Sequence, residues 1–348
     1  MSGSPSPATE TSERPLKIGI LSFAHLHGLS YASVLASRPD VELRVADENA
    51  ERGKPIADQH GVSFTTSYAE LLEWGPDGVV ICSENARHRV LVEQAAAAGA
   101  HVLCEKPLAT SLADGRAMIE ACEKAGVSLM TAFPVRFCGP VVSVARLVRD
   151  GKLGRIHGVA GTNPGTMPGG WFVDPELAGG GAVMDHTVHV ADLLRWILGS
   201  EAVEVYAQVN RLLYPDLPVE TAGTIAVTFE NGVVATIDCS WSRPKSYPTW
   251  GGVTLEFVGD DGVATADAFA QTMNSYYDGP SRSGSQNVQW LPWGDNADAL
   301  MIAEFLAAIR EGRQPQPSGW DGYKATEIAF AAYASVKAGQ PVRLPLEE

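Results

Sequence analysis

The sequence predicts an α/β protein with two domains: a doubly wound parallel sheet at the N-terminus, then an α+β domain with a mainly antiparallel open sheet. The chain has 348 residues, which is too long for one ordinary hydrophobic core. Its first 130 residues alternate between short apolar runs and helical patterns, as in a sheet buried on both faces. After residue 150 the runs alternate or are β-branched, which favours antiparallel strands.

The first domain is predicted at residues 15–135, after a polar tail at 1–14 that is rich in Ser, Pro and Thr and is expected to be disordered. Its strands are expected at 16–21, 41–46, 62–64, 78–82, 101–104 and 129–132. Its helices are expected at 26–37, 51–59, 68–73, 87–98 and 111–125.

The second domain is predicted at residues 136–348. Asn231-Gly232 lies between two strand-like runs and is a strong hairpin signal. A last helical pattern at 323–337 ends before Gly339 and Pro341 and can pack back on the first domain. The runs expected to form strands are 204–213, 221–229, 233–240 and 254–258.

Composition excludes several classes of partner. The chain has 26 basic and 41 acidic residues, and its net charge of −15 would repel nucleic-acid phosphates and anionic lipid surfaces. No apolar run approaches the roughly 20 residues that span a bilayer, and the N-terminus lacks the apolar stretch of a signal peptide. The five cysteines are widely spaced without a CxxC pair, which argues against disulfides. We expect a cytoplasmic protein with a small-molecule partner.

The first strand runs into a helix where dinucleotide-binding folds carry the turn G-x-G-x-x-G. The glycine positions fall on Ser22, Ala24 and His27, so only small size is kept, and only at the first two. A helix N-terminus with free amides can still bind a pyrophosphate. For His25 and His27, exposure to solvent at a helix start is the alternative to cofactor contact. The residues of this turn that we expect to contact the cofactor are Ser22, Phe23, Ala24, His25 and His27.

Asp47 follows the second strand about 20 residues beyond the turn, where a dinucleotide fold places the acid that binds the adenosine ribose. A solvated carboxylate at a strand end is the alternative. Asp47 and Glu48 together would repel the 2′-phosphate of NADP. NAD is therefore the favoured cofactor, and NADP stays open.

Lys106 follows a buried strand, at the edge of the sheet where open α/β folds bind their ligands. A lysine at this place can exchange a proton with a substrate hydroxyl. The alternative is a surface lysine in front of a loop proline, Pro107.

The segment 183–196 is predicted to be a buried helix, because it is apolar over most of its circumference. Asp185, His189 and Asp192 share one stripe of that helix at 3.6 residues per turn. Buried polar groups must be paired or used, since burying them unpaired is unfavourable. We expect Asp185 to orient His189 or the substrate, and the pair to relay a proton next to Lys106.

The same helix offers a metal interpretation, in which His186 and His189 supply ligands together with Asp185 or Asp192. His186 points about 100° away from His189 on a helix, which suits chelation poorly. No Cys/His spacing supports a metal either. We therefore expect no metal, and a place for His186 in the wall of the substrate pocket.

Four motifs, in their order along residues 16–346, resemble the Gfo/Idh/MocA oxidoreductases. They are Glu105-Lys106-Pro107, the turn Gly179-Gly180-Gly181, the helix with Asp185 and His189, and the closing run 338–346. That family includes glucose-fructose oxidoreductase and inositol dehydrogenases. The resemblance implies an N-terminal Rossmann domain and a second domain whose open sheet holds the substrate on one face. The other face of that sheet often holds a partner subunit, so a homo-oligomer is expected.

Motif matching also implies roles for single residues. Lys106 matches the catalytic lysine, often with a cis Lys-Pro bond, while Asp185 and His189 match the substrate-binding and proton-transfer pair. Asn85 and His88 match a loop near the nicotinamide that usually reads Pro-Asn-x-x-His, although Glu84 stands where proline is usual. The cofactor side is thus completed by Ser83, Asn85, His88, Glu105 and Lys106.

On the substrate side, Arg136 matches an arginine that is common near the active site of the family. Trp171 lies close to the glycine turn and can stack on the apolar face of a sugar. A place in the core or in a subunit contact is the alternative for Trp171, as it is for Trp241 and Trp250. The predicted substrate-binding set is Lys106, Arg136, Trp171, Asp185, His186 and His189.

The predicted activity is the reversible oxidation of a secondary hydroxyl on a sugar, glycoside or cyclitol by NAD, with Lys106 or His189 handling the hydroxyl proton. Two alternatives stay open. A redox-neutral enzyme would oxidise a glycoside transiently, eliminate or hydrolyse, and then reduce it again. A nucleotide- or sugar-sensing protein without turnover would match the non-enzymatic branch of the family, but the retained lysine, aspartate and histidine argue against it.

Overall fold

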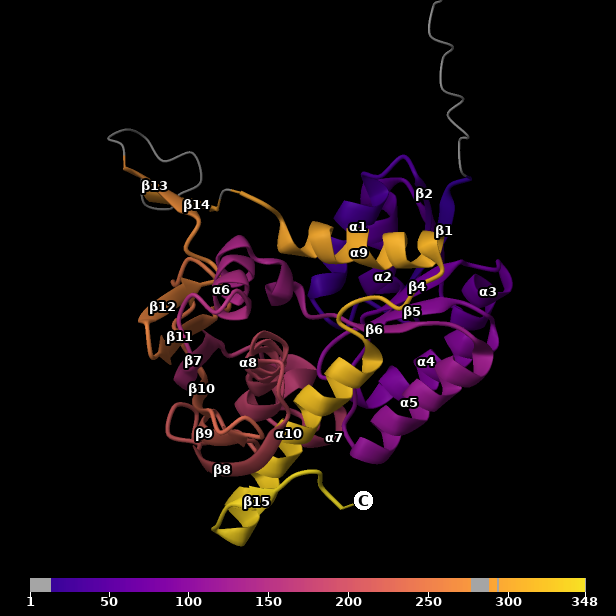
Figure 1. Ribbon diagram of the computed structural model, residues 1–348. Helices are drawn as coiled ribbons and strands as arrows, with labels where there is room; N and C mark the ends of the chain where they lie inside the picture. The colour runs from indigo at the N-terminus through magenta and orange to yellow at the C-terminus, as the bar shows by residue number, and fades with distance from the viewer. Residues whose placement is uncertain (1–13, 277–287, 293, 348) are drawn as a thin grey trace, which may run out of the picture.

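The N-terminal domain is built around a six-stranded parallel sheet in a computed structural model that describes residues 14–276, 288–292 and 294–347. The strand order is β3-β2-β1-β4-β5-β6, which is the Rossmann order with its switch point between β1 and β4. The predicted doubly wound sheet is confirmed (Figure 1). Its strands are β1 (Leu16–Leu21), β2 (Val41–Ala46), β3 (Ser63–Thr65), β4 (Gly78–Ile81), β5 (His101–Cys104) and β6 (Leu129–Thr131).

The helices of this domain begin and end where the sequence supplies caps. Asn49 accepts two backbone hydrogen bonds at the start of one helix, and Gly61 ends it in a left-handed conformation. The predicted tail lies outside the described residues, apart from Arg14, which forms an ion pair with Asp77. The helices are α1 (His27–Ala36), α2 (Ala50–His60), α3 (Tyr68–Glu73), α4 (His88–Ala97) and α5 (Leu112–Ala125), with a 3-10 turn η1 (Asn85–Arg87).

The second domain is a seven-stranded sheet of order β12-β11-β7-β10-β9-β8-β15. Only β7 and β10 pair in parallel, so the predicted mainly antiparallel sheet is confirmed. A separate hairpin is formed by β13 (Thr272–Tyr276) and β14 (Val288–Pro292). The strands of the large sheet are β7 (Ile156–Thr166), β8 (Ala202–Asn210), β9 (Ala222–Phe229), β10 (Val234–Arg243), β11 (Thr254–Gly259), β12 (Gly262–Asp267) and β15 (Val342–Arg343).

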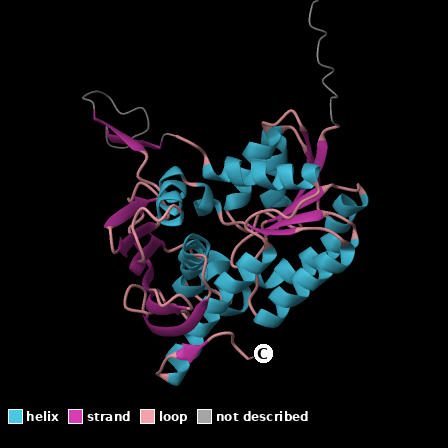
Figure 2. Ribbon diagram, in the orientation of Figure 1, coloured by secondary structure: helices cyan, strands magenta, loops and turns pink. Residues whose placement is uncertain are grey.

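Helices cover one face of this sheet and join it to the first domain (Figure 2). The helix α8 (Ala182–Leu198) and the helix α10 (Gly319–Ala338) share one core with strands of the sheet. The helix α10 also contacts α5 and β6, which agrees with the expectation that the last helix packs back on the first domain. The remaining helices are α6 (Gly139–Arg149), α7 (Pro175–Ala178) and α9 (Ala297–Glu311), with 3-10 turns η2 (Pro134–Phe137) and η3 (Gly170–Val173).

Several elements of the second half of the chain were absent from the sequence-based expectations, among them α9 and β7. The helix α9 lies along α1, and its residues Met301, Phe305 and Leu306 belong to a core cluster of the first domain. The strand β7 contains three glycines and Pro164, which lower β-propensity. Gly161 is needed because α8 crosses close by: a Cβ there would lie 2.6 Å from Val190 Cγ1.

The outer face of the second sheet is the face predicted to hold a partner subunit. It carries exposed apolar side chains, among them Val234, which is 50% exposed, and Val258, which is 40% exposed. Within the described part of the chain, no helix combines the length and the apolar character needed to cross a bilayer.

Candidate active site

A cavity of about 330 Å³ brings together residues from both domains. Lys106 enters it just beyond the carboxyl end of β5, and His27 enters it from the start of α1. The N-terminal half of α8 supplies a third wall. The polar side chains that line the cavity are His27, Lys106, Asn163, Asp185, His186, His189, Thr249 and Asp298. Sites that bind small molecules have volumes of about 300–1,000 Å³, so this cavity is at the lower end of the range.

The centre of the cavity wall is a buried ion pair. Lys106 Nζ donates to Asp185 Oδ1 at 2.7 Å and to the Asp185 carbonyl at 3.2 Å. Trp241 Nε1 donates to the other carboxylate oxygen at 3.1 Å. Burial opposes ionisation of Asp185, but the nearby Lys106 and His186 outweigh it and hold the pKa of that carboxyl well below its ordinary value. The pair therefore places a cation and an anion side by side, facing a small-molecule cavity.

The histidines of α8 differ from the expected arrangement. Asp185 does not make the predicted contact with His189: its oxygens face Lys106, Trp241 and, at 3.0 Å, His186 Nε2. The other nitrogen of His186 lies 2.6 Å from the Asn163 carbonyl. Asp185 and His189 are one helical turn apart, but the carboxylate of Asp185 binds Lys106, which follows β5, and not His189.

His189 lines the same cavity, and one of its ring nitrogens has no hydrogen-bond partner among the described residues. Its buried Nδ1 has no hydrogen bond to any described residue, and its ring lies edge-on to Phe133 at 5.9 Å. Burial, with the charge of Lys106 adding to it, lowers the pKa of His189 well below its ordinary value. A neutral imidazole with an open nitrogen can accept a proton from a bound hydroxyl.

Arg136 is not in the cavity, contrary to its predicted contact with substrate. Its guanidinium binds Asp192 through two hydrogen bonds of 2.7 and 2.5 Å and reaches Asp321 at 3.0 Å. Asp192 is fully buried, and Arg136 is 5% exposed. The stripe on α8 is thus divided: Asp185 serves the cavity, while Asp192, two turns further on, ties α8 to η2 and α10.

The turn after β1 keeps the shape of a dinucleotide-binding turn without its glycines. Ser22 takes the positive φ of 72° that glycine usually supplies. The close helix–strand approach falls on Gly28 instead of His27, since a Cβ there would lie 3.3 Å from Cys82 Cβ. The sequence contained this signal, one position away from where the fingerprint places it.

Several amides of this turn are already used within the chain. Phe23 donates to Asp47 Oδ2 at 2.7 Å, Ala24 to Ser22 Oγ, and His25 to the Cys82 carbonyl. The Leu26 amide, at the start of α1, has no acceptor among the described residues. One open amide at a helix N-terminus fits a pyrophosphate oxygen.

Asp47, the predicted ribose-binding acid, is fully buried. Its carboxylate accepts hydrogen bonds from the Asn49 amide and from the Arg52 guanidinium, at 2.8 Å and 2.7 Å. A ribose hydroxyl reaches Asp47 only if Arg52, whose side chain is 31% exposed, turns outward. The sequence analysis did not single out Arg52. An arginine close to the ribose-binding acid can bind the 2′-phosphate of NADP.

The loop after β4 contacts the backbone that follows Lys106. His88 Nδ1 lies 3.1–3.2 Å from the carbonyls of Pro107 and Leu108, beyond the cis bond between Lys106 and Pro107. Asn85 Nδ2 donates to the carbonyl of Ala178, the last residue before the glycine turn. Asn85 Oδ1 and His88 Nε2 are buried and have no partner among the described residues. These two atoms, in the loop predicted to lie near the nicotinamide, can form hydrogen bonds with a cofactor.

Ser83 and the tryptophans are placed differently. Ser83 Oγ, fully buried, donates to the Glu84 carbonyl. Trp171 does not line the cavity; its Nε1 donates to the Ala24 carbonyl at 3.0 Å, so it lies against the turn of the first domain. The tryptophan in the cavity wall is Trp250, whose ring lies 5.9 Å from that of His186. Trp241 is in the core beneath Asp185.

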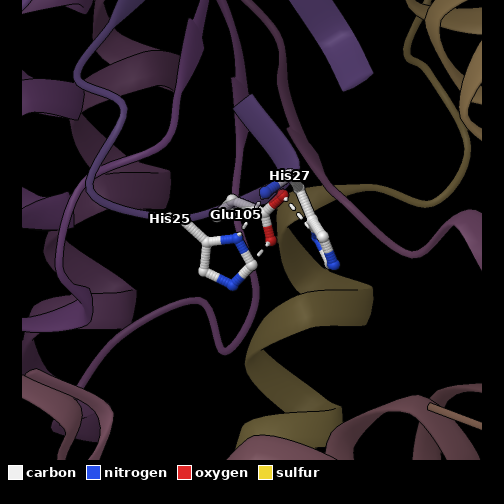
Figure 3. Close-up of side chains that lie close together, drawn as sticks. All are labelled: His25, His27 and Glu105. Carbon is white, nitrogen blue, oxygen red and sulfur yellow. Dashed lines mark hydrogen bonds and ion pairs between the residues drawn. The ribbon is translucent and has the colours of Figure 1, made fainter. Parts of the chain in front are cut away.

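The two histidines of the turn converge on Glu105, as Figure 3 shows. His27 Nδ1 lies 3.1 Å from Glu105 Oε1, and His25 Nε2 lies 3.8 Å from Oε2. Tyr31 Oη donates to Oε1 at 2.6 Å. His25 is 2% exposed, and burial lowers its pKa to about 3. Neither histidine is the solvent-facing residue of the alternative interpretation: His25 is buried and His27 lines the cavity.

A Rossmann sheet whose edge meets a cavity with a buried Lys–Asp pair defines a nucleotide-linked oxidoreductase, and comparisons with known proteins agree. Residues 18–133 match the oxidoreductase family with an NAD-binding Rossmann fold, and residues 141–265 match the GFO/IDH/MocA C-terminal domain. The chain belongs to the Gfo/Idh/MocA family, so the resemblance, the enzyme class and the NAD cofactor predicted from the sequence are confirmed.

Three relatives illustrate the match. The uncharacterized oxidoreductase YrbE of Bacillus subtilis (strain 168) is 32% identical, over 86% of this chain and 88% of the relative. Myo-inositol 2-dehydrogenase of Thermotoga maritima is 28% identical, over 94% of this chain and 98% of the relative. The crystal structure of GenD2 from gentamicin A biosynthesis, in complex with NAD, has a TM-score of 0.87 and 27% identity, covering 99% of this chain and all of the other.

Proposed function

We propose that this enzyme oxidises a secondary hydroxyl of a sugar, glycoside or cyclitol, or reduces the corresponding ketone, with NAD as the redox partner. The observation that carries the proposal is the Lys106–Asp185 pair in the wall of a 330 Å³ cavity, beside the half-buried His189. Relatives whose names include myo-inositol 2-dehydrogenase and D-apiose dehydrogenase support the polyol class of substrate.

Each residue of the pair has a distinct task in this proposal. Lys106 directs its ammonium at the reacting hydroxyl and stabilises the negative charge that develops on oxygen as the proton leaves. Asp185 holds Lys106 in place through the 2.7 Å contact and can accept a hydrogen bond from a neighbouring hydroxyl. His189, with its open Nδ1, receives the proton. NAD, when bound, accepts the hydride.

The cofactor is assigned to the turn and the loops around it. The Leu26 amide would hold the pyrophosphate, with Ser22 and Ala24 allowing close approach, and the unpartnered atoms of Asn85 and His88 would bind the nicotinamide end. Asp47 and Arg52 together meet the adenosine ribose. Because Arg52 can accompany either a hydroxyl or a phosphate, NADP stays open beside NAD.

The direct test is a panel of inositols, aldoses and glycosides incubated with NAD or NADP, followed by the absorbance of reduced cofactor and by product mass. Equimolar formation of NADH and of a ketone is the expected result. Product without net NADH would show the redox-neutral cycle instead. Thermal stabilisation by a polyol, with no product from any member of the panel, would show a sensor and contradict the proposal.

Location and assembly complete the proposal. A cytoplasmic homo-oligomer that associates through the outer face of the second sheet fits the exposed Val234 and Val258 on that face. Light scattering on the purified protein measures the oligomeric state, and a monomer at micromolar concentration would contradict that part of the proposal.

A further inference from the structure

Three potential metal ligands meet between the nucleotide-binding turn and the cavity (Figure 3). His25 and His27 come from the turn before α1, and Glu105 follows β5. One nitrogen of each histidine and one carboxylate oxygen all lie within 4.8 Å of one another. The sequence analysis considered a metal site only on α8. It did not predict this group, because Glu105 lies 78 residues beyond His27 along the chain.

The separations suit a small divalent ion. Ligand atoms at the usual Zn–N and Zn–O distances of about 2.0–2.1 Å are about 3.3 Å apart in a tetrahedron. His27 Nδ1 and Glu105 Oε1 are 3.1 Å apart, and His25 Nε2 and Glu105 Oε2 are 3.8 Å apart. Because these two contacts end on different oxygens of Glu105, the imidazole rings must rotate to bring two nitrogens and one oxygen into one coordination shell.

The electrostatics of Glu105 call for a cation. This carboxylate is fully buried, and no Lys or Arg side chain among the described residues forms an ion pair with it. The ammonium of the adjacent Lys106 is turned away, toward Asp185. A buried carboxylate is stable only when it is paired, strongly hydrogen-bonded or bound to a metal. Tyr31 Oη and the Lys106 amide donate to it, and His27 Nδ1 lies 3.1 Å from Oε1, so the contacts of Glu105 include no side chain with a permanent positive charge.

A second observation comes from His25. Its Nε2 is buried and has no hydrogen-bond partner among the described residues, although it faces Glu105. Phe172 covers the ring at a centroid distance of 5.2 Å, and Trp171 lies at 6.1 Å, so water reaches this nitrogen poorly. A buried nitrogen without a partner is a defect in a closed core, but it is the normal state of a ligand before its metal arrives.

We propose that His25, His27 and Glu105 bind one divalent transition-metal ion, with Zn²⁺ as the reference. The inference goes beyond the proposed function, which requires no metal. Two imidazoles and one carboxylate are the ligands of a catalytic-type zinc site and suit Ca²⁺ or Mg²⁺ poorly. Since His27 also lines the cavity, the fourth position is available to water or to an oxygen of a bound ligand.

Besides rotation of the rings, binding requires an adjustment in the hydrogen bonding of His25. The His27 amide now donates to His25 Nδ1 in a long hydrogen bond of 3.3 Å. When Nε2 binds a metal, the proton of a neutral imidazole moves to Nδ1, and this weak bond is lost. The binding energy of even a weak zinc site exceeds the contribution of one such hydrogen bond, which is about 1 kcal/mol.

The test uses the full-length protein, treated with a chelator and then titrated with Co²⁺ or Zn²⁺ in the absence of substrate. One equivalent of Co²⁺ is expected to bind and to give the visible absorption of a low-coordinate site, which Zn²⁺ then displaces. His27→Gln is expected to weaken Co²⁺ binding at least about 100-fold, because the loss of an outer-shell partner alone weakens metal binding about 10–100-fold. Glu105→Gln should have a similar effect.

His189→Gln is the matched control, since it makes the same change in a histidine of the same cavity, and its Co²⁺ affinity should equal that of the wild type. If the His27 or Glu105 variants do not fold, X-ray absorption of the cobalt-loaded wild type decides, with two imidazoles and one carboxylate expected. Absence of stoichiometric binding, or binding that survives His27→Gln and disappears in His189→Gln, overturns the proposal. Metal binding with no turnover on polyols would leave this site standing while the proposed function fails.

Discussion

The helix α8 carries two buried carboxylates that differ in their surroundings. Asp185 meets Lys106 at the wall of a cavity, whereas Asp192 meets Arg136 in a closed network with Asp321. Arginine keeps its charge and binds a carboxylate through a rigid fork, while lysine is a point charge that can give or accept a proton. The Arg136 pair is therefore suited to fix α8 against its neighbours, and the Lys106 pair is suited to chemistry.

Replacing Lys106 should produce the largest effect. Lys106→Met removes the ammonium but keeps an unbranched side chain, so the negative charge that develops on the substrate oxygen loses its stabilising partner. Turnover of an identified polyol should fall about 1,000-fold, at the upper end of the usual effect of losing one such group. Circular dichroism and NAD affinity should stay close to the wild type. A variant that keeps more than a tenth of wild-type kcat would remove Lys106 from the mechanism.

Replacing Arg136 should affect stability instead. Arg136→Met leaves Asp192 buried and uncompensated, and breaking a buried pair in this way costs about 3–5 kcal/mol of unfolding free energy. Urea denaturation followed by fluorescence measures that loss. The kcat of the folded variant should remain near that of the wild type, because Arg136 does not line the cavity. A large loss of kcat without a loss of stability would restore the arginine to the substrate site.

The neutral His189 should make the protein less stable in mild acid. Lys106, His186 and His27 disfavour its protonation and Asp185 favours it, with burial the largest influence, and its pKa in the folded state is lowered from 6.5. Below pH 6.5 the unfolded chain therefore binds a proton at His189 that the folded chain does not bind. The free energy of unfolding is highest above pH 6.5 and decreases as the pH falls below that value. The slope is up to about 1.4 kcal/mol per pH unit.

Thermal unfolding at several pH values tests this point. The midpoint should decline from pH 7 to pH 5, and His189→Gln should make the decline shallower. Arg136→Met should lower the midpoint of unfolding across this pH range, because it leaves Asp192 without its partner. Equal slopes in the wild type and in His189→Gln would show that this histidine is protonated in the folded protein.

An exposed pair gives the smallest expected effect and calibrates the others. Lys54 and Asp58 are one turn apart on α2, with side chains that are 60% and 64% exposed. Lys54→Ala should change the unfolding free energy by less than about 0.5 kcal/mol, since water and salt screen such pairs. A larger change in urea denaturation would mean that exposure is a poor guide to which ion pairs matter here.

The sequence predicted much of the first domain, because strands buried on both faces leave long apolar runs and helix caps are local signals. It also identified the residues of the Lys106–Asp185 pair, but it expected Asp185 to orient His189 or the substrate and did not foresee its contact with Lys106. Spacing along a helix shows which side chains share a face, and it does not show which side chain arrives from another strand. The expectation for Arg136 came from motif matching, which does not show that its partners are carboxylates of α8 and α10, distant in sequence.

Other parts of the site depend on backbone geometry that composition conceals. Ser22 adopts a positive φ although it is not glycine, and Gly28 performs the close packing expected at His27. The strand β7 has glycine at 161 and 165, where Val190 and His186 of α8 leave no space for a side chain. This contact between distant elements cannot be read from the sequence. Glu105 was expected to contact the cofactor, and its convergence with His25 and His27 could not be read from residues so far apart.

The central claim, that Lys106 and Asp185 act as one unit on the substrate hydroxyl, is tested most directly by a double-mutant cycle. NADH formation is measured at saturating substrate for the wild type, Lys106→Met, Asp185→Asn and the double variant. Residues that act as a unit give non-additive losses, so the double variant should be no slower than Lys106→Met alone. If the two single losses instead multiply in the double variant, the two residues work independently and the account is contradicted.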